Sequence, residues 1–310
     1  MTAKRSKLEP QSPYWYEDLP GRTALLEGNS GKAFPDAGQD VLQINEKYIE
    51  LSRATSIQRG GGVLIGCGML AGMLLMADVL VSIIITVFPK IPALSILLAC
   101  GLIAFLVLII YVIKREIRTP RDLPVRFHRD SGKIISLEYV TKLNPFAHWK
   151  VVQRELNWSH AAAEIAKIAG YNGKTYSVRY SLIIAECDPD SGKVKQRIVL
   201  KADEAFPLHL HRMWAFIRSY MINGPSDLKV VLRPAGVSLK RCLLYYYPVL
   251  DFTAEGHERR RKLNIVEWVF GIVVLIPLFW LFLPLSICEY VALKLAPEPQ
   301  WSNSALDREQ

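Results

Sequence analysis

Cysteine is scarce in this chain, and none of its five cysteines belongs to a CxxC pair. Cys67, Cys100 and Cys288 lie in apolar runs, whereas Cys187 and Cys242 are isolated. This distribution excludes a disulfide framework and a paired-cysteine zinc site, and it agrees with a reducing compartment.

The signatures of common catalytic sites are missing too, because the sequence has no GxSxG elbow, no Walker loop and no HExxH helix. His209 and His211 are two residues apart on a predicted helix, so they face different directions and are interpreted as solvated polar residues. Asp188 and Asp190 resemble the start of a calcium loop, but Gly192 comes too early and the distal glutamate is missing, which favours a hairpin turn. We therefore predict no enzyme activity, cofactor or metal site.

The N-terminal segment, residues 1–60, contains no apolar core of the kind found in secretory signals, so no cleavage is expected. Positive charge, in contrast, is in excess, with a net charge of +9. Nucleic-acid binding is not predicted, because no recognition helix, zinc finger or aromatic-plus-basic RNA signature accompanies that charge. Most clustered Lys and Arg residues lie beside apolar runs instead, where contacts with anionic lipids account for them.

Two long apolar runs, residues 63–88 and 93–113, are separated only by a Pro-Lys-Ile-Pro link. About 20 apolar residues in a helix cross a hydrocarbon core of roughly 30 Å, and both runs are long enough. They predict a transmembrane helical hairpin over residues 61–115, with both ends on one side. Basic flanks stay in the cytoplasm, so Lys90 at the tip is expected on the opposite face. The flanking basic residues are Arg53, Arg59, Lys114, Arg115, Arg118 and Arg121.

A third apolar run lies within residues 264–290, after a basic cluster at 257–262. Its length predicts a C-terminal apolar helix that spans the membrane and places the tail, residues 291–310, outside. Pro277 and Pro284 each remove a backbone donor, so a broken segment that re-enters or lies along the interface is the alternative.

Residues 116–255 are predicted to form a cytoplasmic domain. Turn signals at Asn172-Gly173 and at residues 188–192 separate segments rich in Val, Ile and Tyr. Tight turns between at least six strands imply an antiparallel, strongly curved sheet or a small barrel, although residues 162–168 are alanine-rich and a short helix is an alternative there. The predicted strands are residues 125–128, 133–140, 149–154, 162–168, 177–185 and 194–200.

One amphipathic helix, starting near Pro207, is predicted to close the sheet, and Asn-Gly-Pro at residues 223–225 ends it. This plan resembles a pleckstrin-homology-like domain, and the fold class is an α+β membrane protein. Arg212, Trp214 and Arg218 are the candidate interaction residues of this helix.

The strings PVRFHR at 124–129, MWAFIRSYMINGP at 213–225 and KLAPEPQW at 294–301 carry a more specific similarity. From about residue 41 to 301, the chain resembles a domain-of-unknown-function family of proteobacterial inner-membrane proteins, often encoded beside effectors of type VI secretion. The resemblance implies a multi-pass inner-membrane location and suggests effector immunity or handling. It supplies no catalytic residues.

Asp78 lies inside the first apolar run, where an unpaired carboxylate is costly. A proton relay or a contact with an inserted toxin would be functional readings. We favour a structural role, a protonated or hydrogen-bonded Asp that fixes packing against Ser82, Ser95 or a neighbouring helix.

Gly62, Gly66, Gly68 and Gly72 form two small-xxx-small pairs that permit close helix contact. Their partner is the second helix of the hairpin, the third apolar run, or another copy of the chain in a homo-oligomer.

Three functions follow, in order of preference. The first is an immunity or accessory protein that binds and neutralises a cognate membrane-directed effector. The second is a membrane-tethered adaptor for a cytoplasmic protein or an anionic lipid headgroup, and the third is a transporter or channel component that uses Asp78.

Overall fold

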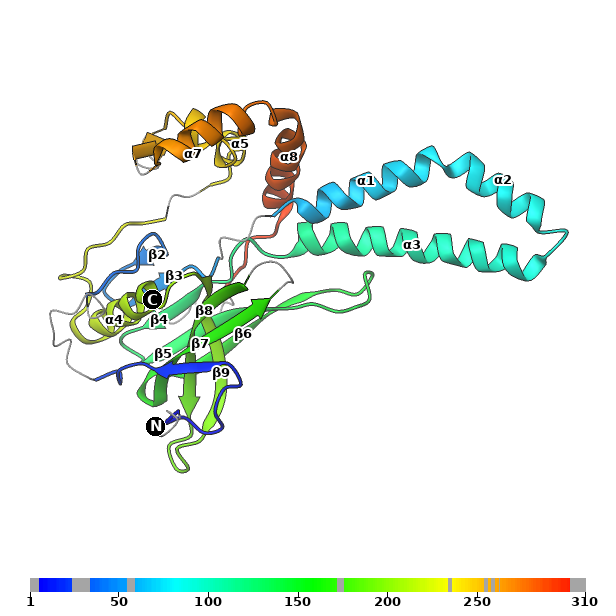
Figure 1. Cartoon of the computed structure of the whole chain (residues 1–310). Coiled ribbons are helices and arrows are strands. Elements are labelled where there is room, and N and C mark those ends of the chain that lie inside the picture. Colours follow the sequence, from blue (N-terminus) through cyan, green and yellow to red (C-terminus); the bar gives the residue numbers. More distant parts are fainter. Residues whose placement is uncertain are drawn as a thin grey trace.

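The computed structural model describes most of the chain and defines a mixed α+β fold. Two antiparallel sheets and a long helix form one part, and further apolar helices project away from it (Figure 1). The described residues are 6–23, 34–54, 59–171, 176–233, 236–253, 256–257, 260–261 and 263–301.

The first sheet has five antiparallel strands in the order β2-β3-β4-β5-β6. The predicted hairpin of residues 125–128 and 133–140 is confirmed as β4 and β5, joined by a turn in which Gly132 has a φ of +61°. The strands are β2 (Val41–Ile44), β3 (Tyr48–Leu51), β4 (Val125–His128), β5 (Lys133–Val140) and β6 (Lys150–Asn157).

The second sheet has four antiparallel strands in the order β1-β7-β8-β9. The alanine-rich segment is a strand and not a short helix, because β7 pairs with β8 along its whole length. The predicted turn at Asn172-Gly173 lies outside the described residues. The strands are β1 (Trp15–Asp18), β7 (Ala161–Tyr171), β8 (Tyr176–Cys187) and β9 (Val194–Glu204), and a 3-10 turn, η1 (Trp158–His160), precedes β7.

The prediction of one curved sheet is thus wrong, since the strands divide between two sheets. Strands β1, β2 and β3 come from residues 15–51, before the apolar helices. Strands β1 and β3 pair with β7 and β4, which follow those helices, and β2 pairs with β3. The sheet domain therefore includes strands of the segment that the sequence places outside it.

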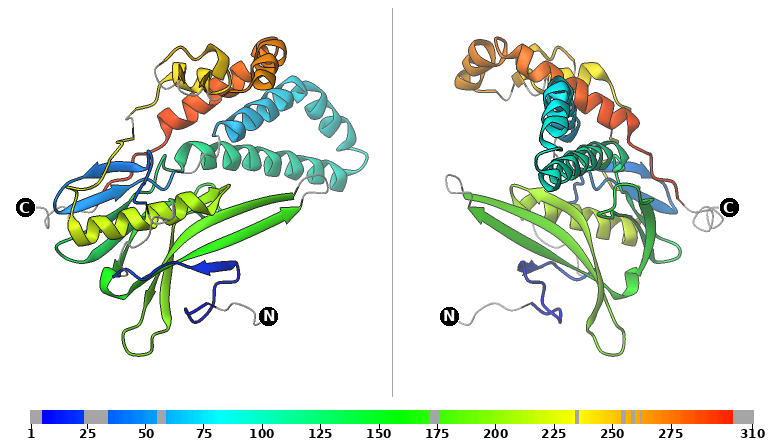
Figure 2. Two further views of the ribbon diagram at one scale, coloured as in Figure 1. Left: turned by 60° about the vertical axis from the view of Figure 1, so that its left-hand side comes forward. Right: turned by 90° about the vertical axis from the view of Figure 1, so that its right-hand side faces the viewer.

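Helix α4 (Pro207–Asn223) is confirmed where the apolar period predicts it, and it ends at Gly224, whose φ is +84°. It packs against β7, β8 and β9 (Figure 2). Trp214 and Tyr220 of α4 share one core with Phe127 of the first sheet and Ile165 of the second. Because all four side chains are fully buried, α4 and the two sheets stabilise one another.

The first apolar run is not one straight helix. It forms α1 (Gly61–Leu75) and α2 (Ala77–Val87), which are bent by 54° at Met76. Helix α3 (Pro92–Arg118) then returns beside both. Among the described helices, only α3 is by itself long and apolar enough to cross a membrane, so the predicted hairpin of two continuous helices is wrong in its first arm.

The third apolar run is also broken, so the predicted single C-terminal helix is wrong, and the break agrees with the alternative prediction of a broken segment. Helix α7 (Ile265–Phe270) continues into a π-helical turn, η3 (Gly271–Leu275), and is bent by 93° from α8 (Phe279–Leu295). The break contains Pro277, which cannot donate a helical hydrogen bond. A short helix, α5 (Leu239–Tyr245), packs on α8, and a 3-10 turn, η2 (Pro248–Leu250), follows α5.

The chain beyond α8 returns to the sheet domain. Arg121 donates through Nη1 to Glu298 Oε1 over 3.1 Å, and Trp301 lies on Arg126 of β4. The start of the tail, predicted on the opposite side of the membrane, therefore lies beside the sheets, and residues 302–310 lie outside the described part of the chain.

Candidate functional site

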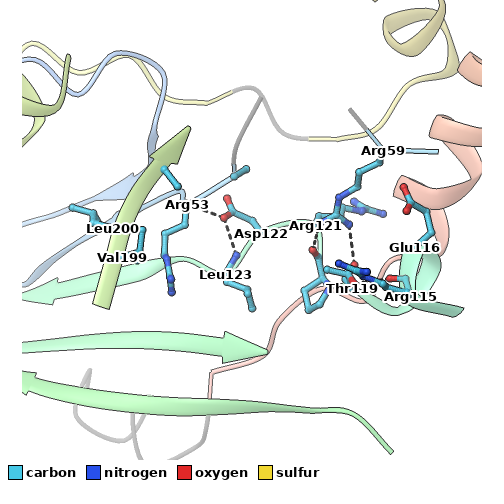
Figure 3. Close-up of a pocket in the computed structure, with 13 residues that line it drawn as sticks. Arg53, Arg59, Arg115, Glu116, Thr119, Arg121, Asp122, Leu123, Val199 and Leu200 are labelled. Atoms are coloured by element: carbon cyan, nitrogen blue, oxygen red, sulfur yellow. Dashed lines mark hydrogen bonds between the residues drawn. The ribbon is translucent and has the colours of Figure 1, made fainter. Parts of the chain in front are cut away.

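A cavity of about 500 Å³ opens where the helices meet the sheet domain (Figure 3). Residues 53, 54 and 59, before the helices, and the segment 115–123, at the end of α3 and beyond, form most of its wall, and β9 supplies the rest. Its charged lining residues are Arg53, Arg59, Arg115, Arg121, Glu116 and Asp122.

Backbone hydrogen bonds hold the guanidinium groups in place. Arg59 donates through Nη1 to the carbonyl oxygen of Thr119 over 2.9 Å, and Arg53 donates through Nη1 to that of Leu137 over 3.1 Å. Arg121 donates through Nε to the carbonyl oxygen of Leu293 in α8. These contacts join the start of α1 to the end of α3, and they join the adjoining segments to β5 and α8.

The two carboxylates of the cavity accept hydrogen bonds from backbone amides. Glu116 Oε1 accepts from the amide of Gly60 at 2.6 Å, and Asp122 Oδ1 accepts from the amides of Arg53 at 2.9 Å and Leu123 at 2.8 Å. Gly60 is required here, because a Cβ atom would lie 2.3 Å from the backbone nitrogen of Glu289. The carboxylates thus order the chain at the junction.

Burial lowers the pKa of the Arg53 and Arg59 guanidinium groups below their usual range, while the nearby carboxylates of Glu138 and Glu116, respectively, act in the opposite direction. Arginine stays protonated under any ordinary condition, so the cavity carries positive charge. Planar guanidinium groups bind phosphate or carboxylate oxygens in pairs. The arrangement suits an anion, either a phosphate group or an acidic segment of a protein.

The sequence predicts these basic residues as markers of topology and as contacts with anionic lipids, and not as the lining of a cavity. The signal for a cavity was the hairpin itself, because two basic flanks on one side of a hairpin converge.

The candidate interaction residues of α4 do not form a surface. Trp214 is fully buried, and Arg218, which is 3% exposed, donates through Nη1 to the carbonyl oxygen of Gly21 over 3.1 Å. Arg212 is half-buried. Helix α4 therefore serves the core and does not present Trp214 or Arg218 to a partner.

The two histidines of α4 are not solvated as predicted. His211 Nε2 lies 2.7 Å from Glu17 Oε1. His209 Nε2 lies 3.4 Å from Asp40 Oδ2, and Lys201 donates through Nζ to Asp40 Oδ1 over 2.7 Å. Both histidines bind carboxylates of the N-terminal segment, which the sequence could not place next to α4.

The predicted turn at Asp188 is confirmed, since Asp188 Oδ2 accepts hydrogen bonds from the amide and the hydroxyl of Ser191. Among the described residues, no three His, Cys, Asp or Glu side chains lie close enough together to hold a metal ion.

Asp78 is exposed in the first turn of α2, next to the bend at Met76. It lines a shallow hollow together with Ser82 and Thr86, whereas the buried Ser95 donates instead to the carbonyl oxygen of Ile84 over 3.2 Å. The expected packing of Asp78 on Ser95 is thus absent from the described contacts.

The glycine pairs separate into two faces. A Cβ on Gly62 would lie 2.8 Å from Glu116 Oε2, and one on Gly66 would lie 2.4 Å from Ile113 Cγ1, so this pair packs on α3. A Cβ atom on Gly68 or on Gly72 would meet nothing within 4 Å among the described residues outside the helix's own backbone. The first pair serves contact within the chain.

The chain belongs to the family of unknown function DUF6708, whose model matches residues 102–310. This region begins inside α3 and includes Arg115, Arg121 and strand β9, which line the cavity. Neither a curated protein nor a solved structure matches the chain.

Proposed function

We propose that this protein is a membrane-anchored immunity or accessory protein that binds and neutralises a type VI secretion effector directed at the same membrane. The observation that carries the proposal is the position of the Arg-lined cavity directly beside the apolar helices. A partner inserted in the bilayer can touch the helices and place an acidic segment in the cavity at the same time.

The surface of the helices supports membrane anchoring. Helix α2 has no buried residue in the described structure, and Leu75, Ile85, Leu97 and Ile103 are all more than 60% exposed. Apolar patches of this extent on a protein mark membrane or partner contacts. In this proposal α1–α2 and α3 cross the bilayer, and the basic junction and sheet domain lie in the cytoplasm.

The identity of the partner rests on the resemblance to inner-membrane proteins encoded beside type VI effectors. Binding suffices for neutralisation, so the function requires a surface and no chemistry of its own. The cavity also favours a second candidate, an adaptor that binds an anionic headgroup and assists effector loading.

The test is a killing assay between siblings. Deletion of the gene should make cells sensitive to attackers that carry the neighbouring effector, and restoring the gene should rescue them. Arg115→Gln should weaken rescue, because Arg115 is exposed in the cavity, whereas Arg179→Gln on the exposed surface of β8 is the matched control.

Two outcomes separate the candidates. Loss of protection on deletion supports immunity. If the deletion strain survives attack like the wild type while its own effector delivery fails, immunity is wrong and the adaptor role replaces it.

A further inference from the structure

The loop between β5 and β6 reaches along the last turns of α3 (Figure 1). Lys114 of α3 donates through Nζ to the carbonyl oxygens of Pro145 and Ala147, the latter over 2.9 Å. The same Nζ lies 4.9 Å from the ring centroid of Trp149, and the Tyr111 ring lies 5.9 Å from that of Trp149. The loop is therefore fixed at the level where the apolar run of α3 gives way to basic residues.

The tip of this loop exposes two large apolar side chains. Leu143 is 91% exposed and Phe146 is 73% exposed. A turn presents them, since the amide of Phe146 donates to Asn144 Oδ1 over 2.8 Å. Water is a poor solvent for such side chains, whereas aromatic and aliphatic groups beside basic residues are typical of a membrane interface.

Between the loop and α3 lies a second cavity, of about 570 Å³. Its charged lining groups come from Lys114, Arg118 and Lys150, with His148 beside them, and no carboxylate is among the described residues that line it. Positive groups that surround a cavity without acidic neighbours fit a phosphate group.

We infer that the β5–β6 loop is an interfacial anchor and that its cavity binds the phosphate headgroup of an anionic phospholipid. The exposed Leu143 and Phe146 select a lipid over a soluble anion, because the acyl chains next to a bound headgroup would cover both side chains. This inference rests on the membrane placement of α3 in the proposed function.

The experiment uses the full chain, free of its native cysteines, reconstituted in phosphatidylcholine vesicles with increasing phosphatidylglycerol. Leu143→Cys carries an environment-sensitive fluorophore, and Asp190→Cys, in the exposed β8–β9 turn, carries the same label as a control. The label at position 143 should shift to the blue as phosphatidylglycerol increases, while the label at position 190 should not.

Arg118→Gln combined with Lys150→Gln should weaken the apparent affinity for phosphatidylglycerol about tenfold, since each basic group near an anionic surface contributes to lipid binding. Arg179→Gln is the control. A label at position 143 that stays water-exposed at every composition, or an unchanged affinity in the double variant, overturns the inference. Reversal of the shift by inorganic phosphate assigns the cavity to a soluble anion and overturns it too.

Flotation of the same vesicles tests the membrane placement separately from the inference about the loop. If the protein fails to float with the lipid, the membrane placement in the proposed function is wrong. If it floats while the label at position 143 stays in water, only the inference about the loop fails.

Discussion

Trp301 lies over the guanidinium group of Arg126, with Arg126 Cζ 4.3 Å from the ring centroid. The same guanidinium lies 4.7 Å from the ring of Tyr48, and its Nε donates to Glu50 Oε2 over 2.7 Å. A cation between two aromatic rings and a carboxylate is a firm attachment point. The last described residue of the chain is thus bound to β4, so the C-terminal apolar helices leave and return on the side of the sheet domain.

Trp214→Ala should destabilise the protein by about 3–5 kcal/mol, the usual cost of removing a large side chain from a core. Trp214 is fully buried against Trp158, with ring centroids 5.5 Å apart, and its Nε1 donates to the carbonyl oxygen of Pro20 over 2.8 Å. Thermal unfolding of the detergent-solubilised full chain measures the effect. Ile222→Ala in the same helix is the control, because the Ile222 side chain is 50% exposed. Equal melting temperatures for the two variants would refute the placement of Trp214 in the core.

The ion pair of Asp40 with His209 should make stability depend on pH. Burial alone would raise the pKa of the Asp40 carboxyl, but the hydrogen bond with His209 and the charge of Lys201 together lower it below 3.8. The hydrogen bond to Asp40 raises the pKa of His209 above 6.5, against the effect of burial.

The directions of these two pKa shifts define the pH range in which the ion pair stabilises the protein. The contribution of His209 is fully present below pH 6.5 and is lost as the pH rises through the raised pKa, and that of Asp40 is present above pH 3.8 and is lost as the pH falls through the lowered pKa. The wild type should therefore lose stability relative to His209→Gln as the pH rises from 6.5 through the raised pKa of His209, as measured by thermal unfolding. Parallel curves for the two proteins over that range would contradict the pairing.

Gly66→Val should loosen the contact of α1 with α3 and cost about 1–3 kcal/mol, because the added side chain overlaps Ile113. Gly68→Val, two residues along the same helix, meets open space and should leave the monomer's melting temperature nearly unchanged. Thermal unfolding and light scattering in detergent report both effects. If Gly68→Val instead dissociates an oligomer, the face of Gly68 and Gly72 packs on another copy of the chain.

Asp78→Asn should preserve both the fold and protection in the killing assay. The described structure shows no hydrogen bond or ion pair of this carboxylate, and a neutral amide at the start of α2 costs less than a charge in the proposed membrane placement. Loss of protection in Asp78→Asn, with rescue by Asp78→Glu, would show that the charge itself contacts the effector or moves protons.

Local patterns predicted the elements that depend on neighbours in sequence. The β4–β5 hairpin follows from its turn at Gly132, and α4 follows from its apolar period and its Gly224 cap. Sequence windows of about ten to twenty residues are enough to predict these features.

The features that local patterns do not predict depend on contacts between residues far apart in the sequence. Strand β3 has only four residues, and its partner β4 comes after α1, α2 and α3 in the sequence. The bend at Met76 has no proline that would predict it from the sequence. The Arg-lined cavity depends on distant residues too, since Arg53 and Arg121 become neighbours only when the helices turn back, and the hairpin pattern indicates no more than that the two flanks converge.

The central claim is that apolar helices anchor the chain in a membrane while the sheet domain and the segment after α8 stay on one side. Single cysteines in an otherwise cysteine-free full chain test it most directly, at Lys90 in the tip, Asp190 in the β8–β9 turn and Gln300 beside Trp301. In intact spheroplasts a membrane-impermeant thiol reagent should label position 90, and it should label positions 190 and 300 only after permeabilisation. Two results would contradict the account. One is labelling of position 300 together with position 90 before permeabilisation. The other is labelling of position 90 only after permeabilisation, together with position 190.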